Sequence, residues 1–171
     1  KQSDRYIANL YQGGLGLPDE SYYKDDTFAD VRAAYVIHVA RMLELAGLSE
    51  PADKAARIMA LESRLADAHW DRVESRDETK TYNKLVRDAV VELAPGFDWP
   101  VWADAVGMPE GAFDDAVVRQ PSYFSAMARA LTELPLEDWK AWLSWNVVHS
   151  AAPCLSKAFV DESFAFYGTT L

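Results

Sequence analysis

The chain has 171 residues, half of them hydrophobic, and 17 Lys and Arg against 27 Asp and Glu give it a net charge of −10. This length suits one domain that buries a sizeable core without a metal or a disulfide. The negative charge disfavours nucleic acid and anionic membranes as partners, because both would repel it. Polar or charged residues interrupt every apolar run well short of the ~20 residues that span a bilayer, so we expect no membrane segment in this chain.

The first predicted element is a short strand over 6–11. A turn rich in glycine follows it, with Gly13, Gly14 and Gly16. Glycine permits backbone angles that are closed to other residues, which indicates a tight turn. The spacing superficially resembles a phosphate-binding loop, but no Lys-Ser/Thr pair follows, which favours a structural turn. Pro18 is suited to the first position of a short helix that runs through Tyr23.

The next predicted elements form a helical hairpin. Apolar side chains recur at steps of three or four along its first helix, at Phe28, Val31, Tyr35, Val39, Met42 and Ala46. Thr27 with Asp30 resembles a capping pair at the start of this helix, and Gly47 ends it. Pro51 opens the second helix, whose apolar face has the same spacing at Ala55, Ile58, Leu61, Leu65 and Ala68.

The middle of the chain predicts shorter elements. A charged stretch over 72–80 connects to a helix over 85–93, and a further helix covers 99–106. A brief extended pairing is indicated at 117–118, before Pro121 opens another helix.

A long helix is predicted from Leu136. Its buried face is expected to carry Trp139, Leu143, Val147, Ala151, Cys154 and Ala158. Pro153 removes an amide donor from this helix and should kink it. On this helical register Cys154 is a small buried residue, whereas Trp142 and Trp145 are the most accessible tryptophans.

These elements predict an all-α fold, mainly helical with long amphipathic helices and at most a short strand pair. Because no linker or repeat divides the sequence, we expect a single helical domain over 1–171. The chain starts at Lys1 without Met or a signal-peptide pattern, and it ends in Thr169-Thr170-Leu171 without a terminating element. We therefore expect it to be a fragment of a larger protein.

The sequence shows no recognisable catalytic centre. A helical zinc hydrolase needs two histidines one turn apart with Glu beside the first, but His38, His69 and His149 are isolated from one another. Lone histidines on helices are more often structural than metal ligands. Glu110 and Asp114 have the spacing of a third zinc ligand and its orienting partner, yet acidic residues are so frequent here that chance explains it.

Nucleophilic and carboxylate catalysis are equally unsupported. The sequence has no G-x-S-x-G elbow, and no cation or helix start near Cys154 would lower its pKa. The adjacent aspartates at 25–26 and 114–115 are typical of helix caps and solvated surfaces. We assign no catalytic, cofactor-binding or metal-binding residue to this chain.

Ordered motifs nevertheless cover essentially the whole chain. The most specific is Gln12-Gly13-Gly14-Leu15-Gly16-Leu17-Pro18 followed by Tyr22-Tyr23. Further along lie Tyr82-Asn83, Pro121-Ser122-Tyr123-Phe124, Leu143-Ser144-Trp145 and Tyr167-Gly168. In this order they resemble the N-terminal, mostly helical region of the neprilysin and endothelin-converting-enzyme family of zinc metallopeptidases.

The resemblance implies that the signature residues are structural rather than catalytic. They are Gly14, Leu15, Gly16, Leu17, Pro18, Tyr22, Tyr23, Tyr82, Asn83, Pro121, Tyr123, Trp145, Tyr167 and Gly168. It also implies a non-catalytic lobe that faces a zinc-bearing lobe of the same polypeptide across a closed chamber and restricts access to small peptides. The zinc and the H-E-x-x-H helix of the family would then lie beyond Leu171, with no cofactor in this fragment.

Two departures from the family pattern have consequences. Pro153 interrupts a helix that the family usually keeps continuous, and the single cysteine cannot supply the disulfides of the animal ectodomains. The second departure suggests a bacterial-type member, either cytoplasmic or secreted, and gives no reason to expect a membrane anchor.

Three hypotheses follow for function. The leading one is a helical lobe that forms one wall of a peptide-cleaving chamber, with peptide substrates and the catalytic lobe as its partners. The alternative is a stand-alone helical protein-interaction module that lacks a catalytic lobe. The third, an independent hydrolase built on scattered carboxylates, has the least support.

Overall fold

A computed structural model describes residues 6–171 and divides them into two compact units. The sheet unit comprises residues 6–14 and 68–133, and the helical unit comprises 15–67 and 134–171. Helices account for most of the described residues, so the prediction of a mainly helical fold is confirmed. No described helix combines the length and the apolar character that crossing a bilayer requires.

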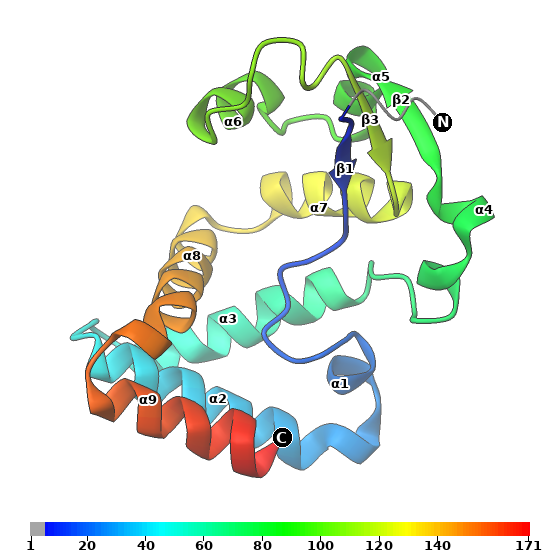
Figure 1. Cartoon of the computed structure of the whole chain (residues 1–171). Helices are drawn as coiled ribbons and strands as arrows, with labels where there is room; N and C mark the ends of the chain where they lie inside the picture. The colour runs from blue at the N-terminus through cyan, green and yellow to red at the C-terminus, as the bar shows by residue number, and fades with distance from the viewer. Residues whose placement is uncertain (1–5) are drawn as a thin grey trace. The chain divides into compact units, whose positions relative to one another are not determined.

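The sheet unit is built around three short strands in the order β1-β3-β2 (Figure 1). Strand β1 (Ala8–Leu10) pairs in parallel with β3 (Asp115–Val118), and β2 (Asn83–Val86) pairs antiparallel with the other edge of β3. The strand expected near the N-terminus and the pairing at 117–118 are confirmed. Strand β2 was not predicted, and the helix expected from residue 85 begins only at residue 87.

Along the described chain, four α-helices of the sheet unit alternate with its strands. They are α4 (Glu78–Thr81), α5 (Arg87–Leu93), α6 (Trp99–Ala105) and α7 (Pro121–Glu133). Pro121 opens α7 as predicted. Proline suits the first position of a helix because an amide N–H at that position would have no partner within the helix. Trp99, Phe113 and Phe124 pack with strand residues into one apolar cluster, which is the core of this unit.

The helical unit contains the predicted hairpin. After the short helix α1 (Ser21–Lys24), helix α2 (Ala29–Leu45) packs against α3 (Pro51–Ala66). Gly47 has a φ of 72°, which suits glycine and lets the chain reverse between the two helices. Two details of the prediction are wrong. Pro18 precedes α1 instead of opening it, and the side-chain cap belongs to the 3₁₀ turn Asp26–Phe28 ahead of α2, where the Asp25 carboxylate accepts a bond of 2.9 Å from the Thr27 amide.

Helix α8 (Leu136–Ala151) buries the opposite face from the one predicted. Trp145 is 1% exposed and Ala141 is also buried, whereas Leu143 and Val147 are 56% and 68% exposed. The sequence of α8 is apolar around most of its circumference, so periodicity alone did not select the correct face. The expectation that Trp145 is accessible is therefore wrong.

The chain also does not continue as one kinked helix past Pro153. Helix α8 ends at Ala151, a 3₁₀ turn spans Ala152–Cys154, and helix α9 (Lys157–Phe164) starts anew. The proline cannot donate to the preceding turn, and here the helix ends instead of bending. Cys154 lies in this turn and is exposed, so the prediction of a buried cysteine is wrong.

The described chain closes with a π-helical turn over Ala165–Thr170. This wide turn buries Phe166 and leaves Tyr167 partly buried against the same core. A Cβ on Gly168 would lie 2.7 Å from the Phe164 ring, which explains why glycine is needed at this position.

Candidate functional site

The signature segment, residues 12–23, begins in the sheet unit. There the Gln12 side-chain amide forms two hydrogen bonds with the Trp70 backbone. The Gln12 Nε2 donates to the Trp70 carbonyl at 2.9 Å, and the Trp70 amide donates to the Gln12 Oε1 at 2.8 Å. The Gln12 amide in turn donates to the buried Gln120 Oε1 at 3.0 Å. Gln12 thus links the segment to two distant parts of the same unit.

Gly13 continues these contacts through its carbonyl oxygen. This oxygen accepts a hydrogen bond of 2.8 Å from the Tyr123 hydroxyl and lies 3.0 Å from the His69 Nε2. His69 also packs edge-on against the Tyr123 ring. His69 therefore orders the turn, and its surroundings do not resemble a metal site.

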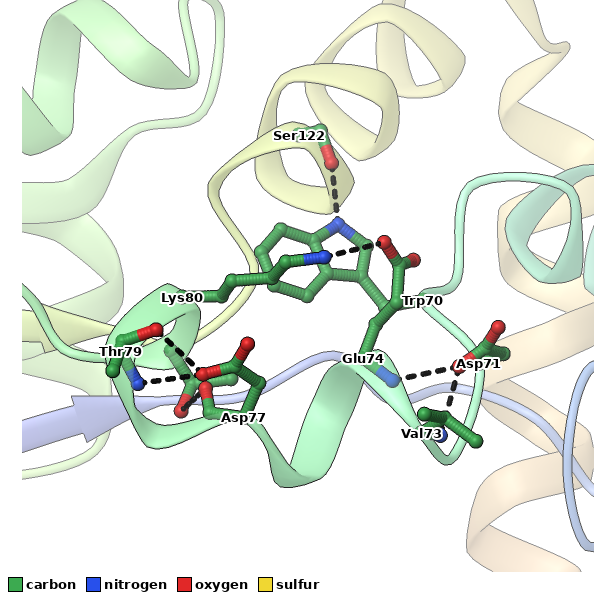
Figure 2. A network of polar contacts seen from close by, with 9 residues as sticks. Trp70, Asp71, Val73, Glu74, Asp77, Thr79, Lys80 and Ser122 are labelled. Carbon is green, nitrogen blue, oxygen red and sulfur yellow. Dashed lines mark hydrogen bonds and ion pairs between the residues drawn. The ribbon is translucent and has the colours of Figure 1, made fainter.

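The charged stretch after Trp70 folds into consecutive capped turns (Figure 2). The Asp71 carboxylate accepts from the Val73 and Glu74 amides, and the Asp77 carboxylate accepts from the Thr79 amide. The Trp70 indole donates to the Ser122 hydroxyl at 2.7 Å. Acidic side chains are used here as caps, in agreement with the preference of helix starts for negative charge.

In the helical unit the signature residues surround a buried carboxylate that the sequence analysis missed, Glu62. The Gly16 amide donates to the Glu62 Oε2 at 3.2 Å, and the Tyr23 hydroxyl donates to the same oxygen at 2.7 Å. The Tyr23 hydroxyl itself accepts from the Gly16 and Leu17 amides. A Cβ on Gly16 would overlap the Tyr35 hydroxyl, so the close approach of this backbone requires glycine.

Other helices complete what we call the Glu62 cluster: Gly16, Tyr23, Tyr35, Glu62, Trp145 and Tyr167. The Tyr35 hydroxyl donates to Glu62 at 2.9 Å and accepts from the Trp145 indole at 2.9 Å. The Tyr167 hydroxyl donates to the Gly16 carbonyl at 3.1 Å. Signature residues from both ends of the sequence therefore meet at one carboxylate.

Burial dominates the electrostatics of this cluster. Glu62 is 1% exposed, and desolvation raises its pKa to about 7 although hydrogen bonds from Tyr23, Tyr35 and Gly16 favour its ionised form. Burial first, and the nearby carboxylate second, raise the pKa of Tyr23, Tyr35 and Tyr167 above the ordinary value. The carboxylate at the centre of the cluster is thus shielded from solvent and held by hydrogen bonds from several elements of the helical unit.

A second buried polar contact joins α2 to α9. The His38 Nδ1 lies 3.0 Å from the Glu162 Oε1, while Arg41 lies 3.7 Å from the other carboxylate oxygen. Burial lowers the pKa of His38 despite the opposing effect of Glu162, which favours the neutral imidazole in this contact. Burial also lowers the pKa of His149.

These histidines do not form a metal site. His38 and His149 belong to the helical unit and His69 to the sheet unit. Throughout residues 6–171, no three His, Cys, Asp or Glu side chains are placed to hold a metal ion. Asp114, one half of the possible zinc-type pair, instead forms an ion pair with Arg87 at 2.7 Å.

The remaining signature residues lie at separate positions. Tyr22 stacks on Phe28 with ring centroids 4.1 Å apart, and the Asn83 side chain donates to the Lys80 and Val118 carbonyls in the sheet unit. Leu15 packs on the helical core, whereas Pro18 and Tyr82 are exposed. The structure therefore brings together only part of the signature set.

The buried groups that were missed had a detectable signal. Glu62 lies four residues after Ile58 and three before Leu65, on the face of α3 that was predicted to be buried. His38 lies three residues after Tyr35 on the buried face of α2. Helical spacing alone places both side chains on buried faces, and a polar residue on an apolar face indicates a buried polar contact.

Comparison with known proteins now assigns the family. The sequence profile of Peptidase family M13 matches residues 1–171, the whole chain. The chain belongs to peptidase family M13. The resemblance drawn from the ordered motifs is thereby confirmed.

Relatives of this M13 chain include "Endothelin-converting enzyme-like 1" of Rattus norvegicus, 27% identical over 93% of the chain and 21% of the relative. "Neprilysin-3" of Drosophila melanogaster is 28% identical over 94% of the chain and 22% of the relative. The chain thus spans between a fifth and a quarter of the length of these relatives.

Solved structures share the fold. The zinc metalloprotease Zmp1 of Mycobacterium tuberculosis, solved with an inhibitor, is 45% identical with a TM-score of 0.93 over 98% of the chain and 26% of Zmp1. PepO from Lactobacillus rhamnosis has a TM-score of 0.75 at 22% identity, over 94% of the chain and 28% of PepO, which shows a common fold alone.

Proposed function

We propose that residues 1–171 together form the non-catalytic helical lobe of a zinc metallopeptidase, and that this lobe makes one wall of the chamber in which the whole protein cleaves peptides. One contrast carries the proposal. The chain aligns over 98% of its length with 26% of a zinc metalloprotease, yet its own sequence has no H-E-x-x-H. A lobe without the motif is suited to exclusion and positioning of substrates.

The described side chains do not fit a zinc ion, since no suitable group of ligands exists among residues 6–171. We therefore place the zinc, and the activation of water, in the remainder of the whole protein. No step of hydrolysis is assigned to this chain.

We further propose that the signature residues have a structural role. Gly16, Leu17, Tyr23 and Tyr167 are hydrogen-bonded to one another or to Glu62, and Trp145 donates to Tyr35, which itself donates to Glu62. Such a connected network of hydrogen bonds is suited to holding the lobe in one shape.

The test is a comparison of substrates with the whole protein. One cleavable peptide is presented free, fused to a folded carrier domain, and fused to an unstructured carrier of equal length. A chamber predicts that the folded fusion is cleaved at least about tenfold less efficiently in kcat/KM than the free peptide. The unstructured fusion controls for length.

Equal cleavage of the free peptide and the folded fusion would contradict the chamber. A native reading frame that stops at Leu171 would contradict the whole proposal and favour the stand-alone interaction module.

A further inference from the structure

The sheet unit contains a cavity of about 250 Å³ that no signature residue lines. Its walls come from the first residue of α5, from helix α6 and from the turn over 108–113. All of these belong to one compact unit, so the shape of the cavity is set locally.

The floor of the cavity is apolar and held in place by aromatic packing. Trp99 stacks on Phe113 with centroids 5.3 Å apart, and Trp102 packs edge-on against Trp99 at 5.6 Å. Met108 packs against the same cluster, and two prolines, Pro100 and Pro109, stiffen the walls. Such a floor suits an aliphatic or aromatic side chain.

The Arg87 side chain lines the cavity beside this floor and supplies a positive charge. The Arg87 Nη2 donates to the Asp114 carboxylate at 2.7 Å, and the Arg87 Nε donates to the Phe113 carbonyl at 3.3 Å. These two bonds fix the plane of the guanidinium while leaving further N–H groups without a partner in the described chain. An oriented guanidinium recognises a carboxylate well.

Two carboxylates complete the rim, Asp104 and Glu110. Both are exposed, and neither carboxylate has an ion-pair or hydrogen-bond partner among residues 6–171. The cavity therefore combines an apolar floor with one cation and two unpaired anions.

We propose that this cavity binds a free α-amino acid with an apolar side chain, of the size of leucine or phenylalanine. The ligand carboxylate meets Arg87, its ammonium meets Asp104 and Glu110, and its side chain lies on Trp99, Phe113 and Met108. The volume of about 250 Å³ suits a single amino acid better than a long peptide. A zwitterion has no net charge, so the charge of −10 does not repel it.

The inference does not depend on peptide hydrolysis, and its test reads binding alone. In the intact protein that contains this chain, methionine methyl groups are labelled with ¹³C and followed by NMR during titration with L-leucine. Met108→Leu identifies the Met108 signal, and the Met42, Met59 and Met127 signals are internal controls, since none of these residues lines the cavity. We expect the Met108 signal to move and to saturate.

Ligand analogues separate the three recognition elements. N-acetyl-L-leucine lacks the ammonium, L-leucinamide lacks the carboxylate, and glycine lacks the side chain. Each is expected to bind about tenfold more weakly than leucine, as for loss of one charged or apolar contact. An analogue that binds as tightly as leucine would overturn the proposal that the cavity recognises a zwitterionic amino acid.

Protein variants test the rim without endangering the fold, because the residues changed are exposed and unpaired. Asp104→Asn with Glu110→Gln should weaken leucine binding about tenfold. Glu92→Gln is the matched control, an exposed carboxylate of the same unit that does not line the cavity. Ala103→Leu fills the cavity and should abolish the Met108 response. An unmoved Met108 signal up to the solubility limit of leucine, or equal binding by the Asp104/Glu110 variant and the control, would overturn the proposal.

Discussion

At the scale of single residues, Glu62 is the most consequential side chain of the helical unit. The Gly16 amide and the Tyr23 and Tyr35 hydroxyls donate hydrogen bonds to it, which favours the carboxylate, but burial opposes ionisation more strongly and raises its pKa to about 7. In the folded chain Glu62 therefore keeps its proton up to a higher pH than in the unfolded chain.

The first prediction concerns stability and pH. Between about pH 4.5 and about pH 7 the folded chain binds the Glu62 proton and the unfolded chain does not, so the free energy of unfolding falls as the pH rises. A shift from 4.5 to about 7 corresponds to about 3 kcal/mol over this window. Urea denaturation at a series of pH values measures it.

The matched variant is Glu62→Gln, which cannot titrate. His38 and His149 have lowered pKa values, so their contribution has the opposite sign: it is present above their unfolded pKa and lost as the pH falls. The difference between the profiles of the wild-type chain and of Glu62→Gln removes these two contributions. A difference that stays flat from about pH 4.5 to about pH 7 would contradict the assignment.

The second prediction compares two glycines of the signature. Gly16→Ala places a methyl group on the Tyr35 hydroxyl and pushes it away from Glu62 and Trp145, which should destabilise the chain by about 3 kcal/mol. Gly13→Ala is the control, because its Cβ would have no atom within 4 Å. Thermal denaturation of both variants measures the two losses of stability. Similar losses would mean that the side chains around Gly16 move to accommodate the added methyl group.

At the scale of elements, helix α8 shows how a fold selects between two apolar faces. Trp145 and Ala141 face the core, while Leu136, Leu143 and Val147 face away from it. The hydrogen bond from the Trp145 indole to the Tyr35 hydroxyl favours this choice, because a buried indole N–H needs an acceptor.

The third prediction tests which face of α8 is buried. Trp145→Ala removes a large side chain and a hydrogen bond from the core and should lower the free energy of unfolding by about 3–5 kcal/mol. Leu143→Ala on the exposed face should change it by less than about 0.5 kcal/mol. Chemical denaturation of the two variants is the measurement, and a larger loss from Leu143→Ala would reverse the orientation described here.

The elements that the sequence predicted well are those with a single apolar stripe. Helices α3 and α7 follow such stripes, and Gly47 after α2 and Pro121 at the start of α7 mark helix boundaries as expected. Strand β2 was missed because its four residues alternate only weakly, and its pairing with β3 depends on a partner 29 or more residues away. Long-range pairing of this kind leaves little trace in a local pattern.

The candidate site was less predictable than the fold. The motifs indicated where structurally special residues lie, but the acceptor that joins them, Glu62, was overlooked although its spacing in α3 places it on the apolar face. A glutamate is normally assigned to the surface, and only the tyrosines and the glycine amide around it make its burial tolerable. Nothing local to α3 encodes those neighbours.

At the scale of the whole molecule, the exposed face of α8 is the feature most relevant to the proposed chamber. Leu136, Leu143 and Val147 recur at helical spacing and are all more than half exposed. We expect the remainder of the whole protein to cover this stripe, because contiguous apolar surface of this kind marks an interaction site.

The fourth prediction follows from that expectation. Leu143→Lys with Val147→Lys should leave the Tm of the isolated chain nearly unchanged but lower the Tm of the whole protein by several degrees, since a covered stripe loses its apolar contacts. Val101→Lys, at a position 63% exposed in the sheet unit, is the control. Differential scanning calorimetry of both forms compares them, and an unchanged Tm in the whole protein would show that the stripe stays uncovered.

The exposed position of Cys154 has a practical consequence. It is the one sulfhydryl of the chain, and it stands in the short turn between α8 and α9, outside the Glu62 cluster. A maleimide fluorophore should therefore attach at a single defined point, with no engineered substitution and no disturbance of the core. Anisotropy of such a probe would follow docking of the lobe in real time, and Cys154→Ser provides the unlabelled blank.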